Sequence, residues 1–340
     1  MKYSQYLLLA QNAIMVAAGY QSSRESSVTQ LGSLKELLNQ NEVVSVTPYE
    51  TGVMTTPASA LVLDAKSTSA GTSWRFFIHH HGTDTKLWFD MGISSNLSSY
   101  PESVQAVHEH FKPDPAARSL AQDTENAGFQ PSDVKYVIAS HAHWDHVRPL
   151  PVDFNQTTMI CGPGTIETYG PAYPTEPESV FDGRIWDSSL RTFPLEELPP
   201  TTNAAWFQLG PFPHALDFFN DGSVFLISAP GHLQGNLALL TRVTTVDGGR
   251  KWLFLGGDCA ACNIFTYWPD APFGLMPAGT MDHATLHENE DEARSTIRLI
   301  SECKKEMGSD FLVWYAHSEM LEGFWEVTNG TATVTESLIG

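Results

Sequence analysis

Three histidines and one aspartate lie within six consecutive positions near the middle of the chain. They follow directly on the apolar run 134–139, and they are His141, His143, Asp145 and His146. An apolar run that changes sharply to polar residues is typical of a buried strand. Imidazole and carboxylate groups together bind zinc, and also iron or manganese. Four such side chains at one strand end can surround two cations if three more ligands come from elsewhere.

The spacing H-x-H-x-D-H after a strand resembles the hallmark motif of the metallo-β-lactamase fold superfamily. The resemblance implies three further metal ligands at the ends of later strands, and the sequence has His232, Asp258 and His317 after apolar runs. By this resemblance His141, His143 and His232 bind one divalent cation. Asp145, His146 and His317 bind a second, and Asp258 bridges the two. Zinc is the expected metal, with iron and manganese as alternatives.

The segment 86–93 is similar to an early strand of the same family that ends near the metals. Within this segment, Asp90 ends the strand and is followed by Met91 and Gly92. A ligating histidine usually donates its second ring N–H to a carboxylate or carbonyl. We therefore expect Asp90 to orient one of the histidines, the alternative being an ordinary turn residue.

The resemblance implies a hydrolase in which a hydroxide shared by the two cations attacks a carbonyl. Within the superfamily, the motif layout most resembles the acyl-homoserine-lactone lactonase-like branch. This resemblance implies the opening of a cyclic ester or amide. That branch usually has a tyrosine three residues after the bridging aspartate, whereas this chain has Ala261. We expect another donor, Tyr267 first, then Tyr169 or Tyr173. Asp145 and Tyr267 are thus the candidate catalytic residues.

Other functions stay open at this point. One is an acyl-thioester hydrolase of the same fold, and another is a redox or binding protein that uses the fold without hydrolysis. Hydrolysis of a β-lactam, an aryl ester or a phosphoester is the remaining alternative. The pair Cys259 and Cys262 has the C-x-x-C spacing of redox sites, but it directly follows Asp258. We interpret the small residues here as the floor of the metal site.

The chain alternates twice between β-rich and helical patterns. Strands are expected at 43–48, 59–63, 73–80, 86–90, 134–139, 205–209, 214–219, 223–229, 237–241, 251–256 and 311–316, and helices at 103–111, 116–127 and 291–306. This order predicts an α+β fold, a four-layer αββα sandwich.

The predicted organisation is one catalytic domain with two additions. Residues 1–42 form an N-terminal helical extension with helices before 20 and around 31–38, and residues 43–340 form the catalytic domain. Within it, the proline-rich stretch 149–204 is expected to form a lid, or else a solvent-facing loop. The candidate apolar lining of the lid is Tyr169, Tyr173, Phe181 and Trp186.

The composition limits the partners. With 19 basic and 39 acidic residues, the net charge is −20, which disfavours nucleic acid and anionic membranes. We expect a small-molecule substrate with an apolar or aromatic portion, and leave a homodimer open. No apolar stretch has the length of a membrane span. A cytoplasmic location is expected, although the weakly signal-like N-terminus leaves secretion open.

Overall fold

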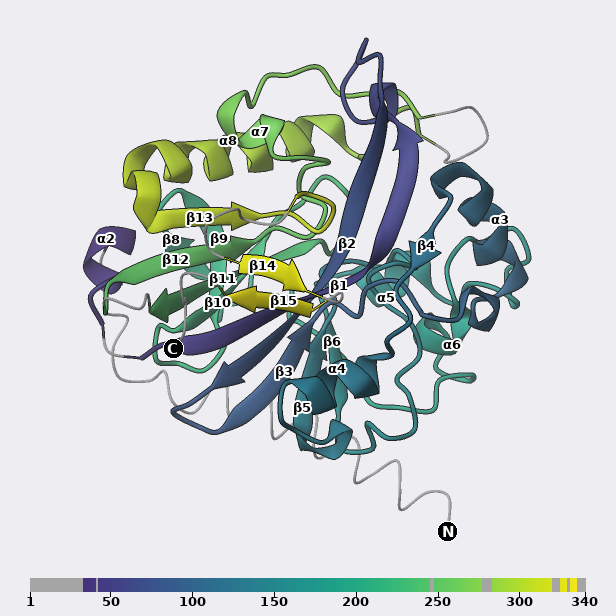
Figure 1. Ribbon diagram of the computed structural model, residues 1–340, viewed down its shortest axis with the longest axis horizontal. Helices are drawn as coiled ribbons and strands as arrows, with labels where there is room; N and C mark the ends of the chain where they lie inside the picture. The colour runs from purple at the N-terminus through teal and green to yellow at the C-terminus, as the bar shows by residue number, and fades with distance from the viewer. Residues whose placement is uncertain are drawn as a thin grey trace.

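The computed structural model describes residues 33–40, 42–244, 248–276, 283–319, 325–328 and 331–334. Within these ranges the strands form two sheets that face each other (Figure 1). The first sheet has the order β14-β15-β1-β2-β3-β5-β6-β7, with β4 paired to β1. The second has the order β13-β12-β11-β10-β9-β8.

The strands of the first sheet are β1 (Val44–Pro57), β2 (Thr68–His80), β3 (Thr85–Phe89), β4 (Asp114–Pro115), β5 (Val134–Ile138), β6 (Thr158–Cys161), β7 (Leu195–Glu197), β14 (Trp325–Thr328) and β15 (Thr331–Val334). Those of the second are β8 (Phe207–Leu209), β9 (Phe212–Asp217), β10 (Val224–Ser228), β11 (Leu237–Thr244), β12 (Arg250–Leu255) and β13 (Phe311–Trp314). The helices are α2 (Leu34–Leu37), α3 (Glu102–Phe111), α4 (Leu120–Asn126), α5 (Thr165–Tyr169), α6 (Gly183–Trp186), α7 (Ile264–Tyr267) and α8 (Glu290–Met307).

The main core lies between the two sheets. Phe89 and Ile138 on the first sheet belong to one buried cluster with Leu239 and Leu253 on the second. Trp314 joins the sheets at one end, because its ring meets that of Phe76 edge-on with the centroids 5.2 Å apart. Side chains that interdigitate in this way hold two sheets at a fixed separation.

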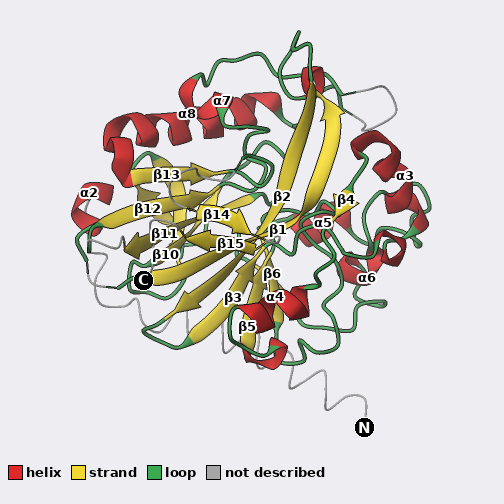
Figure 2. Ribbon diagram, in the orientation of Figure 1, coloured by secondary structure: helices red, strands yellow, loops and turns green. Residues whose placement is uncertain are grey.

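Helix α8 covers the outer face of the second sheet, and α4 packs against the outer face of the first (Figure 2). Ala293, Ile297, Ile300 and Cys303 are buried and recur at helical spacing, so that one stripe of α8 packs on the sheet. Asn289 caps the helix by accepting a hydrogen bond from the Glu292 N–H. The predicted αββα sandwich is therefore confirmed.

Two details of the sequence prediction are wrong. The expected strand at 59–63 is a 3₁₀ turn, Ala58–Ala60, at the tip of the long β1–β2 arm. The stretch 149–204 is also more than a lid, because it supplies the short parallel strands β6 and β7 to the first sheet. The prolines lie outside these two strands, where a missing N–H breaks no ladder.

Helix α2 lies in the predicted N-terminal extension and packs on the second sheet. Leu34 and Leu37 are buried against Phe212, and the indole N–H of Trp252 donates to the Leu34 carbonyl at 2.9 Å. Residues 1–32 lie outside the described residues, so the domain boundary at 42 stays a prediction. None of the helices described is both long and apolar enough to cross a bilayer.

Candidate metal centre

The seven predicted ligands come from the carboxyl ends of strands in both sheets. His141, His143, Asp145 and His146 lie in the turn after β5, and His232 follows β10. Asp258 and His317 follow the parallel strands β12 and β13, where Leu255 pairs with Trp314. Each of these two ligands lies three residues beyond that pair, so the register of the sheet brings them to the same level.

Three imidazoles converge on one point at this edge. The Nε2 of His141 lies 2.9 Å from the Nδ1 of His143, and the Nε2 of His232 lies 3.2 and 3.0 Å from these two atoms. Two nitrogens bound to one tetrahedral zinc are about 3.3 Å apart. The triangle of nitrogens is therefore close to the size that a single zinc ion needs.

A second group lies on the other side of Asp258. His317 Nε2 is 3.1 Å from Asp145 Oδ2 and 3.3 Å from Asp258 Oδ1, and His146 Nε2 is 3.5 Å from the same Asp258 oxygen. The other Asp258 oxygen, Oδ2, faces the first group at 3.6 Å from His232 Nε2. The carboxylate of Asp258 thus has one oxygen toward each group.

The donor atoms of the second group fit a cation. His146 Nε2, His317 Nε2 and Asp258 Oδ1 are buried and have no hydrogen-bond partner among the described residues. Unpartnered buried polar atoms are costly, and few occur in a folded protein. A divalent metal would satisfy all three, and the mixture of imidazole and carboxylate suits zinc.

The electrostatics differ between the two groups. Burial lowers the pKa of His141 and His232 well below its ordinary value and that of His143 to about 4, which leaves their ring nitrogens free of a second proton. Burial also acts on His317, but the carboxylates of Asp258 and Asp145 outweigh it and raise its pKa to about 10. Negative charge is therefore concentrated where the second cation would lie.

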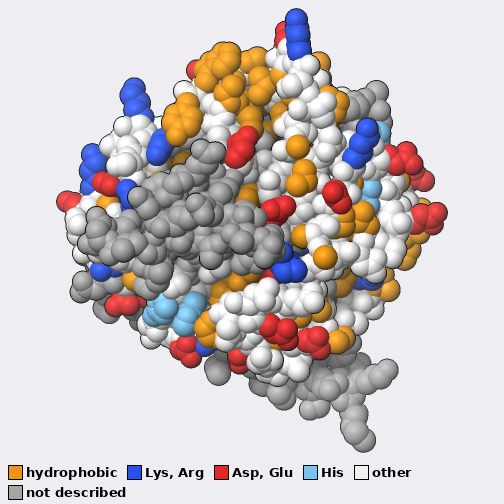
Figure 3. All heavy atoms as spheres, viewed as in Figure 1, with side chains coloured by type: hydrophobic (Ala, Val, Ile, Leu, Met, Phe, Trp, Pro, Cys, Tyr) orange, Lys and Arg blue, Asp and Glu red, His pale blue; other side chains and the backbone are white. Residues whose placement is uncertain are grey.

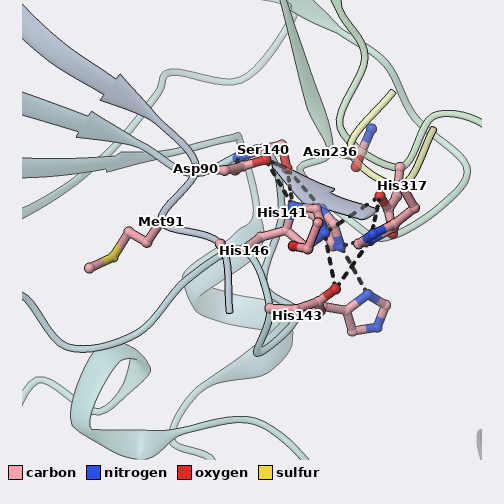
Figure 4. A network of polar contacts seen from close by, with 12 residues as sticks. Asp90, Met91, Ser140, His141, His143, His146, Asn236 and His317 are labelled. Atoms are coloured by element: carbon pink, nitrogen blue, oxygen red, sulfur yellow. Dashed lines mark hydrogen bonds and ion pairs between the residues drawn. The ribbon is translucent and has the colours of Figure 1, made fainter. Parts of the chain in front are cut away.

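Asp90 contacts a predicted ligand, as the sequence led us to expect. Its Oδ2 lies 2.8 Å from His146 Nδ1, and its Oδ1 accepts the Ser140 N–H at 2.7 Å. The residue follows β3, which runs parallel to β5, and it has a positive φ of 61°. That turn directs the carboxylate across the two strand ends, so it orients His146 and leaves Nε2 toward the second group (Figure 4).

Gly231 allows the His232 loop to pack against α8. Its φ is +122°, and a Cβ at this position would lie 2.1 Å from the Ala293 backbone nitrogen. Only glycine fits such a close approach of two backbones. The N–H groups of Glu288 and Asn289 then donate to the carbonyls of His232 and Gly231 at 3.0 and 2.9 Å.

A cavity of about 610 Å³ opens onto both ligand groups. Tyr169 and Phe181 of the predicted lid line it, and the Phe181 ring lies parallel to that of His143 with the centroids 6.1 Å apart. The Tyr169 hydroxyl donates to the Glu288 carboxylate and accepts the Gln234 N–H. These two side chains of the proline-rich stretch therefore lie in the cavity wall, and Tyr169 is hydrogen-bonded there to Glu288. The role of the stretch as a lid stays a prediction.

Three predicted lining or donor residues, Tyr267, Tyr173 and Trp186, do not line the cavity. Tyr267 is 74% exposed on α7 and does not line the cavity, and its neighbours Ile264 and Trp268 are exposed as well. Hydrophobic side chains gather near the top of Figure 3, over the part of the molecule where α7 lies in Figure 1. Because α7 turns its Phe265 inward instead, the Tyr267 hydroxyl points to solvent. Trp186 is buried in the core on the outer side of the first sheet.

Cys259 and Cys262 have the properties of packing residues. Both thiols are free, and burial raises the pKa of Cys259 to about 12. Asn236 also donates to the Cys259 sulfur at 3.4 Å. A redox cysteine needs an accessible thiolate, so this finding favours the interpretation of a floor beneath Asp258.

Sequence reasoning missed His287 and the acidic side chains of the cavity wall. His287 is buried, lines the cavity and lies beside His232, with the ring centroids 5.5 Å apart. Burial lowers its pKa to about 4. No spacing marked this residue, because it precedes α8 and does not end a strand.

Comparison with known proteins gives matches to both the motif and the fold. The family model of the Metallo-beta-lactamase superfamily matches residues 113–151. Gamma-lactamase MBL2 of Gibberella moniliformis is 33% identical over 190 residues, which cover 55% of this chain and 76% of that protein. The cytochrome P450 monooxygenase mpaDE of Penicillium brevicompactum is 30% identical over 271 residues, or 73% of this chain. The chain spans only 20–30% of the length of the mpaDE relatives that it matches.

Solved structures share the fold at low sequence identity. A quorum-quenching N-acyl homoserine lactone hydrolase has a TM-score of 0.57 at 16% identity, over 86% of this chain and 99% of that one. AidC, a dizinc quorum-quenching lactonase, has a TM-score of 0.52 at 12% identity, over 87% of this chain and 97% of that one. These similarities establish the architecture.

Proposed function

Because this chain belongs to the metallo-β-lactamase superfamily, we propose that it is a metal-dependent hydrolase that opens a cyclic amide or ester. The observation that carries the proposal is the pair of ligand groups in the wall of one cavity. Asp258 lies between the two groups, with Oδ1 3.5 Å from His146 Nε2 and Oδ2 3.6 Å from His232 Nε2. A cavity of about 610 Å³ has the size of a small-molecule site.

We assign the first cation to His141, His143 and His232 and the second to Asp145, His146 and His317, with Asp258 between them. Zinc is the metal that this donor set favours. Two cations held there would polarise a substrate carbonyl and lower the pKa of a shared water.

The chain's own side chains have distinct roles in this scheme. Asp90 fixes the orientation of His146 through its 2.8 Å contact. Asp145 lines the cavity, and we assign its carboxylate the role of accepting a proton from water. Burial raises the pKa of Asp145, but His146 and His317 outweigh this effect and hold that pKa below its ordinary value, so the carboxylate is ionised.

The lining of the cavity favours an uncharged substrate. Glu176, Glu178 and Glu288 line it, and among the described residues no lysine or arginine does so. A carboxylate on the substrate would meet like charges in a region of low dielectric. Ring opening creates one new carboxylate, which the same charges would help to expel. Phe181 and Tyr169 provide the apolar surface for an aromatic or alkyl portion.

The relatives support both ring types. A curated relative named as a gamma-lactamase supports a cyclic amide, and fold neighbours named as lactone hydrolases support a cyclic ester. An acyl-thioester hydrolase is the alternative that the same site chemistry allows.

Purified zinc-loaded protein should be offered three kinds of probe: isatin as a bicyclic γ-lactam, dihydrocoumarin as a bicyclic lactone, and S-phenyl thioacetate as a thioester. We expect ring opening of at least one cyclic probe, and its loss in an Asp258→Ala variant. Turnover of the thioester with neither cyclic probe opened would refute the proposal in favour of the alternative.

A further inference from the structure

His287 is a buried polar side chain in the cavity wall that the scheme above does not use. It is 2% exposed, and neither of its ring nitrogens has a hydrogen-bond partner among the described residues. A neutral imidazole has one N–H donor and one acceptor, and leaving both unpaired in a buried place is costly. Outside the proposed metal ligands, no other described residue of the cavity wall has a buried side-chain atom in this condition.

The backbone around His287 is held in place. The Thr285 hydroxyl and the His287 N–H lie 3.3 Å apart, and the next two N–H groups donate to the carbonyls of His232 and Gly231. Residues 287–289 therefore run alongside the loop that carries a proposed metal ligand. A side chain on such a segment keeps its distance to the metal site, as a binding residue must.

The rings around His287 leave it facing the substrate space. Phe273 covers one side, with ring centroids 4.6 Å apart, and His232 lies edge-on at 5.5 Å. Neither neighbour satisfies a nitrogen of His287, because Phe273 has no polar atom and His232 Nδ1 is itself unpartnered. Because His287 lines the cavity, its unpartnered nitrogens are available to a molecule held there.

We propose that His287 binds the substrate, by a hydrogen bond from its ring to a polar atom of an uncharged lactam or lactone that lies against the first ligand group. The inference rests on the proposed function and adds a side chain that holds the substrate by a hydrogen bond. Because His287 neighbours His232, the substrate atom that it binds lies near the first ligand group and therefore near the bond that is cleaved. The apolar part of the substrate then extends toward Phe181. His287 would thereby select rings that carry an N–H or carbonyl group at that point.

A role as an additional metal ligand is the main competing explanation. His287 belongs to neither group of converging donor atoms, so we expect its replacement to leave the zinc content unchanged. Zinc stoichiometry therefore separates substrate binding from metal binding.

The test compares His287→Leu and His287→Gln with the wild type, on whichever of isatin or dihydrocoumarin is turned over. A lost neutral hydrogen bond is worth about a 2- to 12-fold change in affinity. We expect KM to rise by about that factor in His287→Leu with kcat within about twofold, because the bond is made to the bound substrate as well as to the transition state. His287→Gln, which keeps a donor and an acceptor, should recover much of the loss. His108→Leu is the control, because His108 also has a buried unpartnered ring nitrogen but does not line the cavity.

An unchanged KM in His287→Leu, or a loss of zinc in that variant, would overturn the inference. If the leucine variant does not fold, His287→Phe takes its place and is judged by the same two results. If the wild type opens neither probe, the proposed function fails by itself. The dissociation constant of isatin, measured by calorimetry on the zinc-loaded proteins, then decides the role of His287. Equal dissociation constants in wild type and variant, or no binding of isatin to either protein, would reject a substrate-binding role for His287.

Discussion

Replacing Asp90 by asparagine changes one acceptor into a donor without changing the shape of the side chain. The Ser140 N–H cannot move or lose its proton, so the asparagine oxygen must stay on that N–H, 2.7 Å away. The new NH₂ group then faces His146 Nδ1, where Oδ2 lies at 2.8 Å in the wild type. Two donors cannot share this contact. His146 therefore has to place its proton on Nε2, which is the atom that faces the second ligand group.

The expected result is a selective loss of metal at the second site. Residues that orient a metal ligand typically contribute 10- to 100-fold to metal affinity, which corresponds to about 1.4–2.7 kcal/mol. Asparagine tolerates the positive φ of Asp90, but the metal-free protein also loses the buried contact between the Asp90 carboxylate and His146, so its stability should fall as well. Zinc affinity is measured by competition with a chromophoric chelator, and unfolding by urea with and without zinc. Zinc should therefore stabilise Asp90→Asn against unfolding by about 1.4–2.7 kcal/mol less than it stabilises the wild type.

Asp84 supplies a matched control. It too has a positive φ, 53°, and its Oδ1 lies 2.8 Å from His79 Nε2, but it is far more exposed, with 76% of its side chain accessible. Asp84→Asn should leave both zinc equivalents unchanged. Equal zinc affinities in Asp90→Asn and wild type, or the same loss in both variants, would show that the tautomer argument is wrong.

Asp258→Ala should lose at least one zinc equivalent by elemental analysis and nearly all turnover, because it removes the negative charge between two dications; two retained equivalents would contradict the assignment. Asp123→Ala should cost about 3–5 kcal/mol in urea unfolding, because it leaves the fully buried Arg75 without its carboxylate partner, whereas Asp270→Ala, which breaks an exposed ion pair, should cost under about 1 kcal/mol. Burial raises the pKa of Asp217 to about 6, so its carboxylate destabilises the fold above pH 6 and this effect fades as the pH falls toward 4. Asp217→Asn should then be more stable than wild type by about 1–3 kcal/mol at pH 7.5, with the difference vanishing near pH 4. Tyr267→Phe should leave kcat unchanged, because the hydroxyl lies outside the cavity.

The ligand positions and the two-sheet architecture could be predicted because each depends on a local pattern. Every predicted ligand follows an apolar run, and a strand end places a side chain at the edge of a sheet wherever the sheet lies. The orienting contact of Asp90 was predictable for the same reason, since β3 and β5 are parallel neighbours.

The cavity wall could not be predicted in this way. Tyr267 lies nine residues after Asp258, and only the direction of the short helix α7 decides that Phe265 turns inward and Tyr267 outward. His287 lies at the site because its loop contacts the loop of His232, and these two histidines are 55 residues apart in the sequence. The four-residue strand β6 was hidden by the prolines on either side of it.

The distribution of ligands over both sheets has a consequence for how the protein is assembled. All side chains of the first ligand group have been synthesised once the chain reaches Asp258, whereas the second group waits for His317. That residue follows β13, the edge strand of the second sheet, which pairs only with β12 among the described strands. A nascent chain with β5, β10 and β12 in place could hold one cation and no more. Once β13 pairs with β12, His317 would complete the second ligand group and the second cation could bind. Metal uptake would then occur in two stages that follow the order of synthesis.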